Sequence, residues 1–282
     1  MINYNSEWKD YRVIASGDGY KLEDFGGVVL LRPDPQIIWR SPFPLREYPD
    51  LNAVYERGDW TVLKPVPEEF YVSWRSLKFA LKLMKFKHTG VFPEQATNWD
   101  RIIRLIGEAG RQANVLNLFA YTGGATLAAA AAGAKVCHVD SARAMCERAG
   151  KNAALSNLKD APIRYIIEDC EKFVEREIRR GKTYDGIIMD PPSFGRGTKG
   201  EMWKLEDKIN NFVHLTRKLL SPSPLFYLVN SYTAGLQPTV MRNILNLAFY
   251  DIPHQSTAYE IGLPTNTQGV ILPSGTSALI TF

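Results

Sequence analysis

The sequence predicts an α/β protein with a doubly wound, mostly parallel sheet of seven strands and a small β-rich N-terminal region. From residue 98 onward, near-continuous apolar runs alternate with helix-length segments, which is typical of a parallel sheet covered on both faces. The last two apolar runs, 257–262 and 278–282, have only the loop 263–276 between them and are expected to close the sheet as an antiparallel pair. Residues 1–90 differ, because short β-rich runs there lie between glycine and proline turns.

Length and composition set the wider limits. With 282 residues, 45% of them hydrophobic, the chain suits one large domain with a smaller one, and we expect a division into residues 1–90 and 91–282. The net charge of +4 permits a nucleic-acid partner without requiring one. No run approaches the roughly 18 apolar residues of a membrane helix, and the N-terminus has no signal-peptide pattern, so we expect a cytoplasmic protein without membrane contact. Cys137, Cys146 and Cys170 lack metal-site spacing, so they indicate buried side chains and no metal.

The N-terminal region is expected to be a small antiparallel unit. Its runs of β-forming residues are separated by Gly-Asp-Gly, Pro-Asp-Pro and Pro-Val-Pro sequences. The expected strands are 11–15, 28–32, 36–39, 60–64 and 70–74.

A further strand is expected at 76–88, with one apolar and one basic face. Leu77, Phe79 and Leu81 alternate there with polar residues, while Lys78 and Lys82 lie on the polar face and no acid interrupts the basic residues. The lysines fit either a surface that contacts RNA or a solvated edge strand that they protect from aggregation.

The second region supplies the strands and helices of the large sheet in alternation. Strands are expected at 115–120, 135–139, 163–168, 184–189 and 225–229. Helices are expected at 99–109, 126–132, 141–156, 171–180, 205–220 and 238–249.

The turn after the first of these strands is suited to a ligand. Gly123 and Gly124 break the apolar run just before an Ala-rich helix, so backbone can approach a ligand beside unpaired helical N–H groups. Asp140 ends the next strand, where an acidic residue can hold both hydroxyls of a ribose. The Gly-x-Gly-x-x-Gly spacing that holds a pyrophosphate is missing, which favours a cofactor without phosphates. An ordinary strand-to-helix turn and a helix-terminal charge would also explain these residues.

The third and fourth strands end in Asp169-Cys170 and in Asp190-Pro191-Pro192-Ser193-Phe194. Because ligands of doubly wound sheets bind outside the carboxyl ends of the strands, all four strand ends are expected to share one site. Taken alone, Asp169 fits the N-cap of its helix equally well.

At this point the chain resembles the class I S-adenosylmethionine-dependent methyltransferases, which have a Rossmann-like sheet. Within them it resembles the bacterial large-subunit rRNA methyltransferases that modify cytosine C5 and guanine N7. The resemblance covers about residues 75–282, and its carriers are His-Thr-Gly-Val-Phe-Pro-Glu-Gln at 88–95, Leu-Asn-Leu-Phe-Ala-Tyr-Thr-Gly-Gly at 116–124, Val-Asp-Ser at 139–141, the Asn152 region and Asp-Pro-Pro-Ser-Phe at 190–194.

The resemblance implies S-adenosylmethionine as cofactor. Phe119, Tyr121 and Gly123 would line its methionine side, Asp140 would hold the ribose, and Asp169 would face the adenine amino group. The full implied set is Phe92, Pro93, Glu94, Gln95, Asn117, Phe119, Ala120, Tyr121, Thr122, Gly123, Asp140, Ser141, Asn152, Asp169 and Cys170.

Catalysis is expected at Asp190, Pro191, Pro192 and Phe194. The two prolines remove backbone donors and fix a rigid turn, so Asp190 can accept hydrogen bonds from the amino group of a base while Phe194 stacks on it. The cytosine-C5 enzymes of this family use a cysteine nucleophile after the fifth strand. This chain has Tyr232 near that place and no cysteine beyond Cys170, which predicts direct methyl transfer.

The expected function is therefore methylation of RNA, similar to an rRNA substrate, with Lys78, Lys82 and Tyr232 contacting it. Three alternatives stay open: a methyltransferase of protein or small molecules on the same fold, an NAD-dependent oxidoreductase, and a non-catalytic RNA-binding domain. The missing third glycine disfavours NAD. The sequence does not indicate the oligomeric state.

Overall fold

The computed structural model describes residues 2–196 and 202–282. The chain folds into two compact units: a larger one of Thr97–Ile261 with Gly275–Phe282 and the N-terminus up to Asn3, and a smaller one of Tyr4–Ala96 with Gly262–Ser274. The smaller unit thus takes in a stretch from near the C-terminus, and the functional division at residue 90 stays a prediction. No helix of the described residues is long and apolar enough to cross a membrane.

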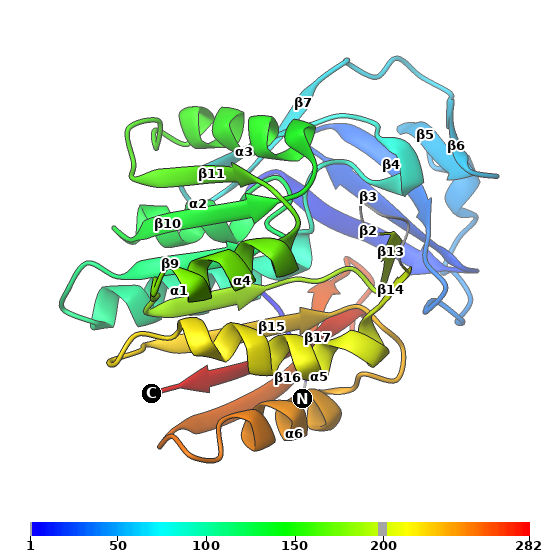
Figure 1. Ribbon diagram of the computed structural model, residues 1–282. Helices are drawn as coiled ribbons and strands as arrows, with labels where there is room; N and C mark the ends of the chain where they lie inside the picture. Colours follow the sequence, from blue (N-terminus) through cyan, green and yellow to red (C-terminus); the bar gives the residue numbers. More distant parts are fainter. Residues whose placement is uncertain (1, 197–201) are drawn as a thin grey trace. The chain divides into compact units, whose positions relative to one another are not determined.

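The larger unit is built on one sheet with strand order β1-β16-β17-β15-β12-β9-β10-β11 (Figure 1). Strands β9, β10, β11, β12 and β15 are parallel, β17 is antiparallel to β15, and β1 is parallel to β16. The predicted doubly wound, mostly parallel sheet is confirmed, and the short β1 adds one strand to the seven. The strands are β1 Ile2–Asn3, β9 Asn114–Leu118, β10 Lys135–Asp140, β11 Ile163–Ile167, β12 Gly186–Met189, β15 Phe226–Ser231, β16 Gln255–Pro264 and β17 Ile271–Thr281.

Helices cover both faces of this sheet (Figure 1). In β9, Val115 faces one core with Ile102 and Ile106 of α1, whereas Leu116 faces the other core with Phe173 of α4 and Phe212 of α5. Side chains that alternate between two apolar layers make each central strand apolar throughout. The helices are α1 Ala96–Glu108, α2 Gly124–Ala131, α3 Arg143–Leu155, α4 Cys170–Arg179, α5 Leu205–Thr216 and α6 Pro238–Ala248, with the 3₁₀ helix η4 Arg217–Leu219 after α5.

Two expectations for the larger unit need correction or addition. The predicted loop 263–276 is wrong over most of its length, because β16 runs on to Pro264 and β17 starts at Ile271. A hairpin that the sequence did not predict follows the Asp190 loop, with β13 Phe194–Arg196 antiparallel to β14 Met202–Lys204.

The smaller unit contains a five-stranded sheet in the order β2-β3-β4-β5-β6 and a hairpin of β7 and β8. All neighbours are antiparallel except β4 and β5, which are parallel, so the expected purely antiparallel unit is wrong at that pair. The elements are β2 Tyr11–Gly17, β3 Tyr20–Phe25, β4 Val28–Pro33, η1 Leu45–Glu47, β5 Leu51–Glu56, β6 Asp59–Val62, β7 Phe70–Trp74, β8 Leu77–Leu81, η2 Lys85–Lys87 and η3 Pro93–Gln95.

Two predicted strands of this unit are corrected. Residues 36–39 form a turn region, because the amide of Ile37 donates to Asp34 O and Ile38 is 91% exposed. The predicted strand 76–88 ends at Leu81, since Phe86 and Lys87 adopt φ of 59° and 63°, which no β-strand accommodates. Its lysines beyond Leu81 therefore do not share one strand face.

Candidate active site

The loop between β9 and α2 follows a strained path that its neighbours hold in place. Phe119, Tyr121 and Gly123 have φ of 56°, 51° and 91°. Non-glycine residues held at positive φ cost on the order of 1–3 kcal/mol each and persist only where the surroundings fix them. The Ala120 amide donates to Val139 O over 3.1 Å, which folds the loop across the end of β10.

Side chains from two helices stabilise the same loop. The buried Asn152 of α3 donates from Nδ2 to Thr122 O over 3.0 Å. The Phe119 amide donates to Cys170 Sγ, at the start of α4, over 3.3 Å. Gly123 lies so close to α3 that a Cβ on it would be 2.9 Å from the Ala149 Cβ. The loop is therefore fixed before any ligand arrives.

Asp140 is the polar centre of this edge of the sheet. Its Oδ2 accepts from the Tyr121 amide and its Oδ1 from the Ala142 amide, both over 2.8 Å. Burial raises the pKa of Asp140 above its ordinary value, against the two amides, which lower it. Each carboxylate oxygen keeps acceptor capacity beyond its amide, so the oriented pair suits the two hydroxyls of a ribose.

Asp169 is half-buried and caps α4. Its Oδ1 accepts from the Lys172 amide over 3.1 Å, which is the helix-capping role that the sequence also suggested. The cap uses one oxygen, and a carboxylate has a second with which to accept from an amino group. The capping role and the predicted adenine contact are therefore compatible.

The Asp190 loop lies beside the β9 loop at the neighbouring strand end. The Asp190 amide donates to Leu118 O over 3.4 Å, which joins the ends of β12 and β9. Further along, Ser193 Oγ accepts from Thr233 Oγ1 over 2.7 Å, and Ser193 O accepts from the Leu205 amide over 3.0 Å. The loop is thus fixed at its start and at its end.

The hairpin after this loop contributes a residue that the sequence did not single out. Trp203 of β14 donates from Nε1 to Pro192 O over 2.7 Å. Its ring lies 5.6 Å from that of Phe119 and 6.0 Å from that of Phe212, so one side chain links the Pro-Pro turn, the β9 loop and α5. Trp203 is therefore a positioning residue, and no local pattern in the sequence draws attention to it, because the β13–β14 hairpin was not predicted.

Phe119 and Phe194 point to different surroundings. The Phe119 ring packs on Trp203 and Phe212, so it is the backbone of Phe119 that belongs to the loop. Phe194, in β13, is 64% exposed. An exposed ring four residues after Asp190 is suited to stacking on a flat substrate. Tyr232, just beyond β15, is half-buried beside Gly275.

Asn117 lies below this edge, within β9. Its Nδ2 donates to Thr126 Oγ1 over 2.9 Å, and the same hydroxyl lies 2.9 Å from His138 Nδ1. Burial lowers the pKa of His138 to about 4, so the ring is neutral and Nδ1 can accept from Thr126. These three buried side chains therefore join β9, α2 and β10 by hydrogen bonds.

Of the other predicted residues, Ser141 is exposed directly after β10 and Pro191 is buried, and the rest belong to the smaller unit. Pro93, Glu94 and Gln95 form η3 and are buried, and burial raises the pKa of Glu94. Phe92 is half-buried with its ring 5.5 Å from that of His88. Lys78 and Lys82 are both exposed on or just after β8.

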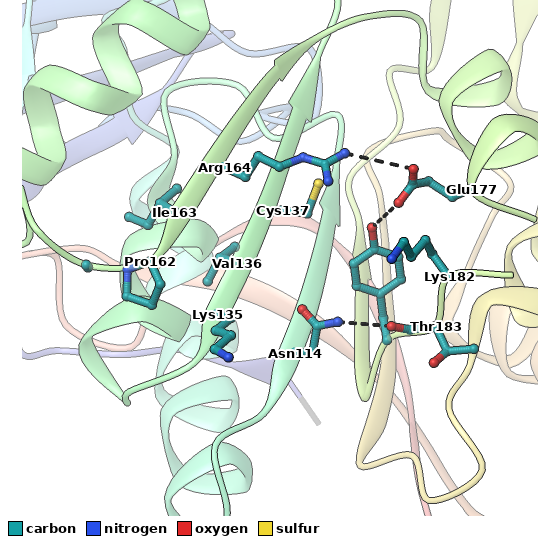
Figure 2. Close-up of a pocket in the computed structure, with 12 residues that line it drawn as sticks. Asn114, Lys135, Val136, Cys137, Pro162, Ile163, Arg164, Glu177, Lys182 and Thr183 are labelled. Atoms are coloured by element: carbon teal, nitrogen blue, oxygen red, sulfur yellow. Dashed lines mark hydrogen bonds and ion pairs between the residues drawn. The ribbon is translucent and has the colours of Figure 1, made fainter. Parts of the chain in front are cut away.

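A cavity of about 550 Å³ lies elsewhere on the larger unit, at the amino ends of the strands (Figure 2). Asn114, Lys135 and Ile163, at the starts of β9, β10 and β11, line it, so it is at the sheet edge opposite to Asp140. Glu177 at its wall accepts from the Tyr184 hydroxyl over 2.8 Å and faces Arg164 at 3.9 Å. None of the predicted site residues lines this cavity.

No group of three or more His, Cys, Asp or Glu side chains within residues 2–196 and 202–282 is arranged to hold a metal ion. Cys137, Cys146 and Cys170 are buried, as the sequence predicts.

Comparisons with known proteins point to one family. Residues 53–236 match the family described as S-adenosylmethionine-dependent methyltransferase. Curated relatives named ribosomal RNA large subunit methyltransferase K/L include one from Shewanella frigidimarina, 32% identical over 60% of this chain and 22% of that protein, and one from Shewanella loihica, 35% identical over 52% of this chain and 19% of that protein. The chain thus spans about a fifth of the length of these relatives. The crystal structure of a SAM-dependent methyltransferase from Agrobacterium tumefaciens superposes with a TM-score of 0.93 and 34% identity, covering 100% of this chain and 93% of that one.

Proposed function

The chain belongs to the S-adenosylmethionine-dependent methyltransferase family, and from this premise we propose that it methylates a base in RNA, by direct transfer without a cysteine nucleophile. The enzyme class and the cofactor follow from the family. The substrate, the site residues and the course of transfer are the proposal.

The residues at the carboxyl edge of the sheet fit this cofactor. Asp140, oriented by two amides, would hold the ribose hydroxyls, and Asp169 would accept from the adenine amino group. When bound, S-adenosylmethionine supplies a methyl group on a positively charged sulfur. The fixed loop 119–123 would bind it without the entropy cost of ordering.

The Asp190 loop is the observation that carries the proposal. The Asp190 amide donates to Leu118 O, directly before the loop 119–123, and Ser193 fixes the other end of the Asp190 loop, so a rigid turn holds the Asp190 carboxylate beside the proposed cofactor site. Asp190 would accept a hydrogen bond from the amino group of a base, and the exposed Phe194 would stack on its face. Alignment of donor and acceptor alone can lower a barrier by several kcal/mol, at best about 7–11.

The cysteines support direct transfer. A thiolate nucleophile needs access and a low pKa. Here burial raises the pKa of both Cys137 and Cys146 to about 11 and that of Cys170 further still. A ring nitrogen that is already nucleophilic needs no thiolate, which favours such an acceptor over cytosine C5.

Two observations support an RNA substrate. The curated relatives carry ribosomal RNA in their names, although they are several times longer than this chain. The exposed Lys78 and Lys82 provide cations for phosphates. A ribosomal RNA substrate would place the protein in the cytoplasm, which we propose with it.

Nucleoside mass spectrometry tests the proposal. RNA from cells that lack this protein should have lost one methylated nucleoside, which returns with the wild-type gene and not with Asp190→Asn. An unchanged nucleoside profile, with methyl label from the purified enzyme found in protein or small molecules, would overturn the RNA substrate.

A further inference from the structure

The turn formed by residues 84–88, here the Phe86 turn, presents an aromatic ring to solvent. Phe86 is 75% exposed, and Lys85 before it is exposed as well. A single exposed apolar ring is not unusual by itself, but residues held in strained backbone conformations cluster at functional sites, so an exposed ring on such a backbone points to a function.

The backbone of this turn is unusual at two successive residues. Phe86 has φ 59° and ψ 34°, and Lys87 has φ 63°. Residues other than glycine, asparagine and aspartate seldom adopt this left-handed region, and bulky ones least of all. A glycine at position 86 would form the same turn without strain, yet the chain has phenylalanine.

The turn is anchored from the sheet beside it. Trp60 of β6 donates from Nε1 to Met84 O over 2.7 Å, and the Met84 amide donates to His88 O over 3.0 Å. Arg32 donates from Nη1 to Lys87 O over 3.0 Å. Arg32 is itself fixed by two hydrogen bonds, of 2.6 and 2.7 Å, to the fully buried Glu23. These hydrogen bonds therefore fix the backbone of the turn that carries the exposed Phe86 ring.

The three lysines near the Phe86 ring in the sequence, Lys82, Lys85 and Lys87, differ in their exposure to solvent. Lys87 is half-buried and donates from Nζ to Pro33 O over 2.8 Å, and burial lowers its pKa. Lys87 therefore helps to hold the turn on β4. Lys82 and Lys85 are exposed and remain available to an anion.

We propose that the Phe86 turn is a base-stacking site for single-stranded RNA, in which the Phe86 ring stacks on an unpaired base and Lys82 and Lys85 contact the flanking phosphates. Aromatic rings beside cations are the usual platform for unpaired nucleotides, because every base has a face to stack and every nucleotide a phosphate. The inference rests on the proposed RNA substrate and adds a contact on the smaller unit, made by residues other than those proposed for transfer.

Fluorescence anisotropy with a labelled single-stranded RNA, measured on the full chain at several salt concentrations, tests the inference. Phe86→Ala should weaken binding by about 5- to 150-fold, the equivalent of one lost stacking contact, and leave the salt dependence unchanged. Phe86→Trp should bind like the wild type. Ile38→Ala is the matched control, because Ile38 is an exposed apolar residue of the same unit, and it should have no effect.

Two further variants separate stacking from charge and from folding. Lys85→Ala should weaken binding and flatten the plot of log affinity against log salt by about 0.7. Phe86→Gly should raise the melting temperature, because glycine relieves the strain, while losing the same RNA affinity as Phe86→Ala.

The outcomes distinguish this inference from the proposed function. Wild-type RNA affinity in Phe86→Ala would overturn the stacking site and leave the RNA substrate intact, whereas no RNA binding by the wild type would overturn both. If vesicles containing phosphatidylserine bind the wild type but not Phe86→Ala, while RNA binding is unchanged, the turn contacts membranes and the inference is wrong. Binding of S-adenosylhomocysteine should be equal in all variants.

Discussion

Replacement of Gly123 by alanine tests whether the loop 119–123 is fixed by packing as well as by hydrogen bonds. Gly123 has φ 91°, and a Cβ on it would lie 2.9 Å from both the Ala149 Cβ and the Leu127 Cδ1. Leu127 can rotate away, but the Ala149 Cβ is attached directly to the α3 backbone. The left-handed conformation should cost about 1–2 kcal/mol and the overpacking about 1–3 kcal/mol. We expect Gly123→Ala to lose about 2–5 kcal/mol of unfolding free energy.

Gly133→Ala supplies the matched control. Gly133 has φ 90°, but a Cβ there would meet no atom within 4 Å. Only the conformational cost of about 1–2 kcal/mol applies, so the difference between the two variants isolates the contact with α3.

Urea unfolding measures the stabilities, and calorimetry with S-adenosylhomocysteine measures the effect on the site. Because the Tyr121 amide and Asp140 share a hydrogen bond, a shift of the loop should weaken cofactor binding in Gly123→Ala and not in Gly133→Ala. Equal losses of stability, or unchanged cofactor affinity in Gly123→Ala, would refute the reasoning.

Three other results are expected. Asp140→Ala should weaken S-adenosylhomocysteine binding by roughly 1.5–3 kcal/mol in calorimetry, while the exposed Asp160→Ala does not; equal affinities would remove Asp140 from the site. Because burial lowers the pKa of His138 to about 4 from an unfolded value near 6.5, its contribution to stability is complete above pH 6.5 and falls as the pH drops towards 4. Urea unfolding should therefore show about 2–3 kcal/mol more loss between pH 7 and pH 4.5 for the wild type than for His138→Gln, and parallel losses would contradict this. RNA containing 5-fluorocytosine should form no covalent adduct in denaturing electrophoresis, and a stable protein–RNA band would show a cysteine nucleophile after all.

The strands of the large sheet could be predicted because both of their faces are buried. Ile187, Ile188 and Met189 of β12 are all at most 1% exposed, so their apolar character identifies the strand directly. β3 could not be recognised in this way, because it includes Glu23 and Asp24, and only the structure shows that Glu23 is buried against Arg32.

The parts of the candidate site that could be predicted are those whose position follows from a single short stretch of sequence. Asp140 follows from the end of β10, and Gly123 follows from the break between strand and helix. The link from Trp203 to Pro192 O depends on a hairpin that brings distant residues together, and local sequence does not reveal it. The error at 76–88 has a similar origin: the alternation there extends past Leu81, but the positive φ of Phe86 follows from anchors in other strands.

The most direct test of the account is transfer of tritiated methyl from S-adenosylmethionine to purified RNA by wild type, Asp190→Asn and the surface control Asp160→Asn. We expect the wild type and Asp160→Asn to label RNA and Asp190→Asn to lose labelling while it binds S-adenosylhomocysteine as tightly as the wild type. Undiminished labelling by Asp190→Asn would contradict the role of the Asp190 loop, and label in protein with none in RNA would contradict the proposed substrate.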